Sequence, residues 1–233
     1  MKLSIVVPAF NEEKLLGETL GCIRAAAGAL DCDIELIVCD NNSTDGTAEI
    51  ARNAGAAVVF EPVNQIARAR NAGAAHATGE WLVFVDADSF PSRALFLEMN
   101  GFLKSGEILG GGCTVQMESD DRFARLAVWM WNRVSRAMHW AAGSFIFCRA
   151  TAFRELGGFN EALYAAEEID FSRRLKRLGK MTILHRHPLL TSGRKARLYS
   201  WRELLSILFR AIVTGGKALR RREECFAWYD GRR

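Results

Sequence analysis

Largely apolar runs alternate with segments of helical periodicity through the first 90 residues. The runs suit strands that are buried on both faces of a parallel sheet, and they span Leu3–Pro8, Ile34–Cys39, Ala56–Phe60 and Trp81–Val85. Between them, apolar residues recur at helical spacing and predict helices over Glu12–Ala29, Thr44–Ala54 and Ala67–Ala77. Ser43 or Thr44 is the expected cap of the second helix. The alternation predicts βαβ units with right-handed crossovers, and so an α/β fold with a mainly parallel, Rossmann-like sheet.

The pattern is less regular beyond Pro91. It predicts helices over Ala94–Leu103, Ala150–Leu156 and Glu167–Leu178, and strands over Cys113–Met117, Ser144–Cys148 and Met181–Leu184. An amphipathic helix is expected over Asp121–His139, because seven apolar residues follow i, i+3, i+4 spacing: Phe123, Leu126, Ala127, Met130, Trp131, Val134 and Met138. We expect this stripe to face the core, with the wall of a cleft as the alternative.

Composition indicates one globular domain with an uneven charge distribution. The chain has 233 residues, of which 49% are hydrophobic and 25% charged. The first 172 residues contain 14 basic and 23 acidic residues, whereas residues 173–233 contain 17 and 4. The six cysteines form no CxxC pair and the N-terminus has no long apolar region, which favours reduced thiols in a cytoplasmic protein. No apolar run approaches the roughly 18 residues of a membrane-spanning helix.

The C-terminal tail is both apolar and basic. Trp201–Leu219 is rich in leucine, isoleucine and phenylalanine, is interrupted by charges, and is followed directly by Arg220–Arg222. Such a segment either lies on an anionic membrane surface or packs on the body of the protein.

Polar residues gather where the predicted strands end. Pro8–Glu13 follows the first strand, Asp40–Asn42 the second and Asp86–Asp88 the fourth. In an open parallel sheet, ligands bind beyond the carboxyl ends of the strands, where the strand order reverses. Two carboxylates two residues apart, as in Asp86-Ala87-Asp88, suit one hard divalent cation such as Mg²⁺ or Mn²⁺. The sequence therefore predicts a binding site at this edge of the sheet.

Six motifs in order resemble the glycosyltransferase family 2 enzymes, which have the GT-A fold. They are Ile5–Glu13, Val38–Thr47, Ala69–Gly73, Phe84–Asp88, Gly157–Glu161 and Glu167–Phe171. The resemblance covers residues 3 to about 195 and implies transfer of a sugar from a nucleotide-diphosphate donor to an acceptor hydroxyl. It also implies that residues 1–199 form one catalytic domain, with a nucleotide-binding half (1–90) and an acceptor half (91–199), followed by the basic amphipathic tail (200–233).

The resemblance assigns roles to residues around the predicted site. The residues expected to bind the nucleotide are Pro8, Ala9, Phe10, Asn11, Glu12, Asp40, Asn42, Arg70, Asp86 and Ala87. Arg70 is expected to lie near the phosphates of the nucleotide. Asp86 and Asp88 are the expected metal ligands, with His187 preferred to His185 as a third.

Glu167-Glu168 stands where the family usually has a Glu-Asp pair, and Glu168 is the expected general base. Its longer side chain departs from the family pattern. Ser192 and Arg194 lie in a segment that we expect to close over the diphosphate as a lid. One base and one metal suit inversion, although the retaining subset of the family stays open.

The expected partners are a nucleotide sugar and an acceptor with a hydroxyl, whether saccharide, lipid or small molecule. UDP-sugars are the default donors and GDP-mannose is the alternative. The competing classes are a catalytically inactive nucleotide-sugar-binding protein and a sugar-phosphate nucleotidyltransferase, although the latter should carry a glycine-rich loop after the first strand. A dinucleotide oxidoreductase would need GxGxxG there, which is absent. The acidic body disfavours nucleic acid as a partner.

Overall fold

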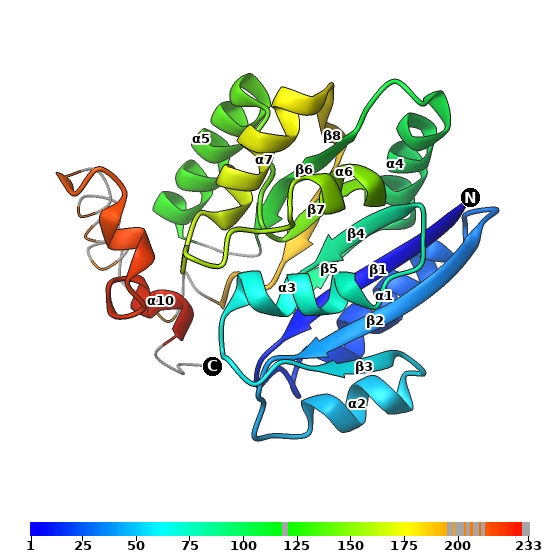
Figure 1. Cartoon of the computed structure of the whole chain (residues 1–233), viewed down its shortest axis with the longest axis horizontal. Coiled ribbons are helices and arrows are strands. Elements are labelled where there is room, and N and C mark those ends of the chain that lie inside the picture. Colours follow the sequence, from blue (N-terminus) through cyan, green and yellow to red (C-terminus); the bar gives the residue numbers. More distant parts are fainter. Residues whose placement is uncertain are drawn as a thin grey trace.

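A single sheet forms the centre of the molecule in the computed structural model, which describes residues 1–117, 121–194, 198, 203, 206, 210 and 213–229. The sheet has eight strands in the order β3-β2-β1-β4-β7-β6-β8-β5. Helices cover both of its faces (Figure 1). The predicted α/β class is confirmed.

The first half of the chain forms a parallel unit. Its elements are β1 (Lys2–Ala9), α1 (Leu16–Ala27), β2 (Asp33–Asp40), α2 (Thr47–Asn53), β3 (Ala57–Phe60), α3 (Ile66–Ala75) and β4 (Trp81–Val85). β1 pairs in parallel with both β2 and β4, so the strand order reverses at β1. The carboxyl ends of β1, β2 and β4 therefore open on one edge, where a ligand site is expected.

The second half runs in mixed directions. Its elements are β5 (Ser89–Phe90), α4 (Arg93–Ser105), β6 (Gly110–Met117), α5 (Arg122–Met138), β7 (Phe145–Arg149), α6 (Ala150–Glu155), α7 (Glu167–Leu178) and β8 (Met181–Thr191). β7 is antiparallel to β4 and to β6, while β6 and β8 are parallel. Because β7 runs against β4, its beginning lies beside the end of β4 and the residues there join the same edge.

Two apolar clusters hold the helices to the sheet, one on each face. The first joins α1, α2 and α4 to the sheet, and the second joins α3, α6 and α7. Four phenylalanines pack together in the second cluster at ring-centre distances of 4.7–5.7 Å, and they are Phe84, Phe153, Phe159 and Phe171. Such rings contribute most to core burial, so they fix α6 and α7 against β4.

Three consecutive glycines allow β6 to fit between β7 and β8. A Cβ at Gly110 would lie 2.4 Å from the Phe147 carbonyl oxygen, one at Gly111 2.2 Å from that of Thr182, and one at Gly112 2.6 Å from the Ala141 Cβ. These separations are far below normal contact, so the close approach requires the absence of side chains.

The helices that follow β1 and β2 begin later in the sequence than predicted. α1 begins at Leu16 and α2 at Thr47, later than predicted, and neither Ser43 nor Thr44 caps α2. Ser43 instead forms two hydrogen bonds in the loop. Its hydroxyl accepts from the Asn11 N–H, and its own N–H donates to the Asp40 side chain. Local side-chain hydrogen bonds of this kind compete with helix formation.

β8 is longer than predicted because it pairs twice with β6. After a register shift at Cys113/Val115, Leu189–Thr191 pairs with Val115–Met117. The residues between, 185–188, are exposed. The strand thereby carries the chain from Leu184 to the edge where β4 ends.

The apolar stripe of α5 does not face the core, which corrects the prediction. Of the stripe, Phe123, Leu126, Met130, Val134 and Met138 are exposed, and Ser135 is the buried residue of the helix. The stripe residues also do not line the pocket described below. Helical periodicity identified the helix correctly but could not tell which side its stripe faces.

The described end of the tail packs on the body. It comprises η1 (Lys217–Arg220), η2 (Glu223–Cys225) and α10 (Phe226–Tyr229). The Tyr164 N–H donates to the Leu219 carbonyl, and Figure 1 shows α10 beside the start of α3, where the Ile66 N–H donates to the Tyr229 hydroxyl. Nine of the 19 residues of the predicted segment Trp201–Leu219 lie outside the described residues. Among the described residues, no helix has the length and apolar character needed to span a membrane.

Candidate active site

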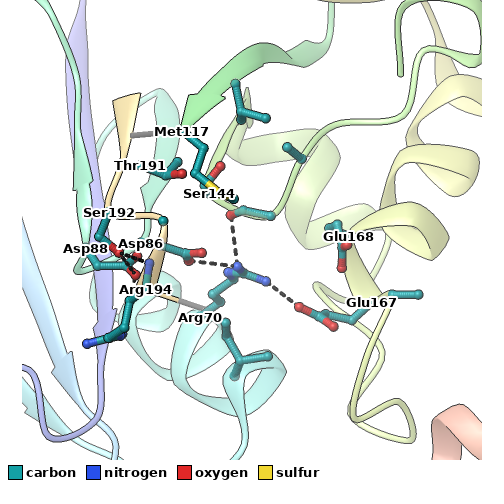
Figure 2. Close-up of a pocket in the computed structure, with 16 residues that line it drawn as sticks. Arg70, Asp86, Asp88, Met117, Ser144, Glu167, Glu168, Thr191, Ser192 and Arg194 are labelled. Atoms are coloured by element: carbon teal, nitrogen blue, oxygen red, sulfur yellow. Dashed lines mark hydrogen bonds and ion pairs between the residues drawn. The ribbon is translucent and has the colours of Figure 1, made fainter. Parts of the chain in front are cut away.

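A cavity of about 220 Å³ opens where β4, β6 and β8 end and α7 begins. Asp86, Asp88, Ser192 and Arg194 lie on one side of it and Glu168 on the other, with Arg70 and Glu167 beneath (Figure 2). The remaining lining residues are Ile66, Val115, Met117, Ala142, Gly143, Ser144, Ala166, Thr191 and Gly193. Residues from both halves of the chain therefore meet in one pocket.

Arg70 is buried at the base of the pocket and connects its two sides. Its guanidinium donates to Glu167 Oε1 at 2.5 Å, to Asp86 Oδ1 at 3.0 Å and to the Gly143 carbonyl at 2.9 Å. Burial alone would lower the pKa of Arg70, but Asp86, Glu167 and Glu168 raise it, so the group stays charged. The side chain is 1% exposed, and we interpret it as a fixed bridge between β4 and α7.

Glu168 faces the pocket from the first turn of α7. Burial raises the pKa of its carboxyl to about 8, the neighbouring charge of Glu167 adds to this, and Arg70 opposes it. Its backbone carbonyl accepts from the Ser172 hydroxyl, which in turn accepts from the Ala141 N–H. A carboxyl with a pKa in this range can take up and release a proton near neutral pH, as general acid–base catalysis requires.

Arg194 holds the other side of the pocket. It forms a two-pronged ion pair with Glu12 at 2.7 Å for each contact and lies 3.3 Å from Asp88 Oδ2. The Ser192 hydroxyl donates to the same Asp88 oxygen at 2.8 Å. Burial would lower the pKa of Arg194, but Glu12 and Asp88 raise it. The segment after β8 is thereby fastened to the loops after β1 and β4.

The loops expected to bind the nucleotide form a network beside the pocket. Asn11 has a positive φ of 52°, and its side-chain oxygen accepts from the Thr44 N–H at 2.8 Å. The Asp40 carboxylate accepts from the Ser43 N–H at 3.0 Å, and Asn42 also has a positive φ, of 67°. Loops held in this way present fixed polar groups, which is a property of preorganised binding sites.

Several predicted residues are brought together, and others are not. The pocket unites Arg70, Asp86, Asp88, Glu167, Glu168, Ser192 and Arg194. The other nucleotide-binding candidates do not line it, and they are Pro8, Ala9, Phe10, Asn11, Glu12, Asp40, Asn42 and Ala87. Ala87 is turned into the core, and its carbonyl accepts from the Thr19 hydroxyl at 2.8 Å. The roles assigned to these residues stay predictions.

The structure does not bring His187 to the aspartates. His185 and His187 lie on the exposed stretch of β8, whereas the pocket lining begins further along the strand, at Thr191. Within the described residues, no group of three histidine, cysteine or acidic side chains is arranged to hold a metal. The cause is the length of β8, which places three residues of strand, 188–190, between His187 and the pocket.

Sequence reasoning missed part of the pocket wall. Val115 and Met117 line it because β6 ends at the same edge as β4, and Gly143 contributes its carbonyl to Arg70. The predicted strand end at Met117 was a usable signal for the first two residues. The sequence held no signal for Gly143, because it contributes a backbone carbonyl and any residue type has one.

The donor set fits a divalent cation that also binds a diphosphate. Asp86 and Asp88 both line the same cavity, with the Ser192 hydroxyl beside Asp88. Mg²⁺ is commonly held by one or two carboxylates while substrate phosphates and water complete its coordination. In the structure each aspartate pairs with an arginine, which shows that both carboxylates are placed to meet positive charge.

Comparisons with known proteins agree with this geometry. The model of glycosyl transferase family 2 matches residues 4–156, more than half of the chain. The glycosyltransferase EpsJ of Bacillus subtilis (strain 168) is 30% identical over 125 residues, which cover 52% of this chain and 36% of EpsJ. This chain therefore aligns with about a third of that relative.

Solved structures share the fold. The mannosyltransferase PcManGT of Pyrobaculum calidifontis, in complex with GDP-Man and Mn²⁺, superimposes with a TM-score of 0.70 at 21% identity, covering 97% of this chain and 69% of that one. Glucosyl-3-phosphoglycerate synthase of Mycobacterium tuberculosis, with Mn²⁺, UDP and glucosyl-3-phosphoglycerate, gives 0.67 at 22% identity, covering 91% and 78%. The fold is that of the GT-A glycosyltransferases. With the family match, the chain belongs to glycosyl transferase family 2.

Proposed function

We propose that this protein transfers a sugar from a nucleotide-diphosphate donor to an acceptor hydroxyl, with Glu168 as general base. One observation carries the proposal: a single pocket sets the Asp86–Asp88 carboxylates opposite a carboxyl whose pKa is raised to about 8. Family membership supplies the reaction class. UDP-sugars are the favoured donors and GDP-mannose is the alternative, since one structural neighbour was solved with UDP and another with GDP-Man.

Glu168 acts on the acceptor. As the acceptor oxygen bonds to the anomeric carbon, Glu168 takes the hydroxyl proton, and the bond from that carbon to the diphosphate breaks. The electron pair of that bond leaves with the nucleotide diphosphate. A neutral hydroxyl is a weak nucleophile, so a base placed on the acceptor side has its largest effect in the transition state. A single displacement of this kind inverts the anomeric configuration.

Asp86, Asp88 and the Ser192 hydroxyl would hold Mg²⁺ or Mn²⁺. When bound, the ion offsets the negative charge that develops on the leaving diphosphate. Arg70 keeps Asp86 in place from below through its contacts with Glu167 and Gly143. Arg194 contacts Asp88, and we expect its guanidinium to exchange this carboxylate for a diphosphate oxygen, a pairing that suits its planar fork.

Thermal stabilisation by nucleotide sugars, with and without Mn²⁺, tests donor binding. A donor at about a hundred times its Kd stabilises the folded state by about 2.7 kcal/mol. For a domain of this size that raises Tm by about 5–10 °C. Asp86→Asn should abolish the manganese-dependent part of the shift. If none of UDP-sugars, GDP-mannose or their diphosphates raised Tm with Mn²⁺ present, the proposal would fail.

Release of nucleotide diphosphate separates a transferase from an inactive binding protein. The active enzyme releases nucleotide from its donor, slowly to water and faster when an acceptor is supplied. Glu168→Gln should still bind the donor but turn it over far more slowly. A wild-type protein that binds donor yet releases no nucleotide over a panel of saccharide, lipid and small-molecule acceptors would be the binding protein.

A further inference from the structure

The inward side of α5 faces the body, and on it Ala124, Val128 and Asn132 are half-buried and Ser135 is buried. The Asn132 side chain accepts from the Val115 N–H at 3.0 Å and donates to the Val115 carbonyl at 2.8 Å. The Ser135 hydroxyl donates to the Trp140 carbonyl at 2.6 Å, and Ser135 is the buried residue of the helix. The apolar stripe therefore does not hold α5 in place.

The stripe instead forms an apolar face on the outside of the molecule. We use this name for five residues whose exposed fractions are large: Phe123 (74%), Leu126 (52%), Met130 (54%), Val134 (43%) and Met138 (44%). At 100° per residue they fall within one third of the helix circumference. Contiguous apolar surface of this kind marks an interaction site.

A basic face borders the apolar face along the same helix. It consists of four exposed arginines, Arg122, Arg125, Arg133 and Arg136, together with Trp129. Trp129 is 54% exposed, and the Arg133 guanidinium lies 4.8 Å from the centre of its ring. The helix contains no acidic residue between Arg122 and Met138. The outward side of α5 therefore combines exposed apolar residues with uncompensated positive charge, and contact with water explains neither.

The neighbouring helix α7 shows what an ordinary exposed face looks like. Its outward positions carry Arg173, Lys176 and Arg177, its first turn carries Glu167, Glu168 and Asp170, and Leu178 is its one exposed large apolar residue among the described positions. Both helices belong to the second half of the chain. The apolar face is therefore specific to α5.

We propose that α5 docks this protein onto an anionic lipid surface. An amphipathic helix with arginines on its polar side and Phe and Leu on the other is suited to lie in the plane of the headgroups. The apolar face would enter the boundary between headgroups and acyl chains, and the four arginines would meet lipid phosphates. Each basic residue near such a surface strengthens binding roughly fivefold.

The charge argues against a second copy of the chain as the occupant. A symmetric contact between two α5 helices would bring eight arginines together with no acidic residue from either helix, and like charges at an interface oppose association. An anionic bilayer supplies both an apolar layer and the compensating negative charge.

Docking through α5 would place the pocket near the lipid surface. Asn132 forms two hydrogen bonds with the backbone of Val115, and Val115 and Met117 line the pocket. α5 also forms the outer edge of the acceptor half in Figure 1, next to α7. The lipid binding itself does not depend on the transfer reaction, and its test uses no donor or acceptor.

Co-sedimentation of the full chain with vesicles tests the proposal. We expect binding to vesicles of phosphatidylcholine mixed with phosphatidylglycerol, weak binding to phosphatidylcholine alone, and release as salt is raised. The double variant Leu126→Glu/Met130→Glu should lower the partition constant at least tenfold. Arg125→Gln/Arg136→Gln should lower it about 25-fold, which is two fivefold steps.

Matched controls lie on other helices. Leu97→Glu/Phe102→Glu removes two exposed apolar residues from α4, and Arg52→Gln/Arg177→Gln removes two exposed arginines from α2 and α7. Both should leave partitioning within about twofold, because surface changes away from a binding face have small effects. Circular dichroism checks that every variant is folded.

Fluorescence gives a second, local measurement. Bromine-labelled acyl chains should quench part of the tryptophan emission, and Trp129→Phe should remove that quenched part. The proposal is overturned if phosphatidylglycerol does not increase binding, or if the α5 variants partition like the controls. It is also overturned if light scattering shows a dimer that Leu126→Glu/Met130→Glu dissociates, since a second copy would then cover the face.

Discussion

Two arginines hold the two aspartates of the pocket, and they differ in depth. Arg70 is 1% exposed and joins Asp86 to Glu167, whereas Arg194 is 15% exposed and joins Asp88 to Glu12. Arg70 comes from the middle of a helix packed on the sheet, and Arg194 from the segment that follows the last strand. The same charge at two depths serves as a fixed support in one place and as an exchangeable contact in the other.

The energetic reason lies in what remains after each arginine is removed. A buried carboxylate left without its partner costs far more than one that water can reach. Glu167, with a side chain that is 5% exposed, depends on Arg70 in this way, whereas water reaches Asp86, which is 23% exposed. Asp88, with a side chain that is 20% exposed, can turn to solvent or to a cation when Arg194 leaves.

The largest expected effect is on turnover and comes from changing Glu168. Glu168→Gln keeps the shape of the side chain and removes its ability to take a proton, so kcat should fall by about 10²–10⁴-fold. Steady-state release of nucleotide diphosphate measures this. Asp170→Asn, on the same helix, is the control: its carboxylate pairs with Arg174, and turnover should change little. A Glu168→Gln variant that kept wild-type kcat would exclude Glu168 as the base.

Arg70→Met tests the buried support directly. The change leaves two carboxylates without their buried partner, and the free energy of unfolding should fall by about 3–5 kcal/mol. Urea denaturation followed by circular dichroism measures it.

Arg68→Met is the matched control for that change. Arg68 lies two residues earlier on α3 and pairs with Glu61 and Glu161 near the surface, so its loss should cost no more than about 1 kcal/mol. Equal losses for the two variants would remove the distinction between a buried and an exposed support.

The pH dependence of turnover sharpens the comparison. Because the pKa of Glu168 is raised to about 8, its base form predominates only above that pH, and kcat/KM should rise with pH and then level off. At pH 6 the rate should be about a hundredfold below its plateau, a tenfold loss for each pH unit. Arg70 opposes the rise in this pKa. A folded Arg70→Lys variant should therefore show the rise of kcat/KM with pH near its wild-type position. A rise centred near pH 4 in the wild type would contradict the assignment of Glu168 as the base.

The smallest effect is expected for Arg194→Ala. Arg194 is 15% exposed but its partner Glu12 is only 6% exposed, so its loss should cost about 1–3 kcal/mol of stability, less than the loss of Arg70. Because Asp88 loses a competing cation, Mn²⁺ alone should bind this variant a few-fold more tightly, while the KM for the donor should rise. Isothermal titration with Mn²⁺ and steady-state kinetics measure the two changes. If manganese affinity fell together with donor affinity, Arg194 would be a support like Arg70.

The sequence predicted the four parallel strands of the first half to within one residue at each end, because a buried parallel sheet needs apolar runs. Trp81–Val85 and Glu167–Leu178 were predicted to the residue, and Asp86, Asp88 and Glu168 were placed at their ends. The loops were less predictable. The starts of α1 and α2 are set by hydrogen bonds between segments about 30 residues apart, such as Asn11 to Thr44.

Arg70 shows why the site could be identified more readily than its internal arrangement. A motif places an arginine near a phosphate site, but its depth depends on partners 16 and 97 residues away, Asp86 and Glu167. The stripe of α5 was misjudged for a related reason. Periodicity reports the width of an apolar face and not what covers it, and here a different side of the helix faces the body, where Asn132 bonds to Val115 of β6 and Ser135 is buried.

The glycine triplet of β6 limits how this fold can be redesigned. Residues 110–112 tolerate no side chain because three neighbouring segments already fill the space a methyl group would need. Five residues further along the same strand, Met117 faces the pocket without that restriction. A library aimed at new acceptors should therefore hold the first three positions of the strand constant and vary its far end.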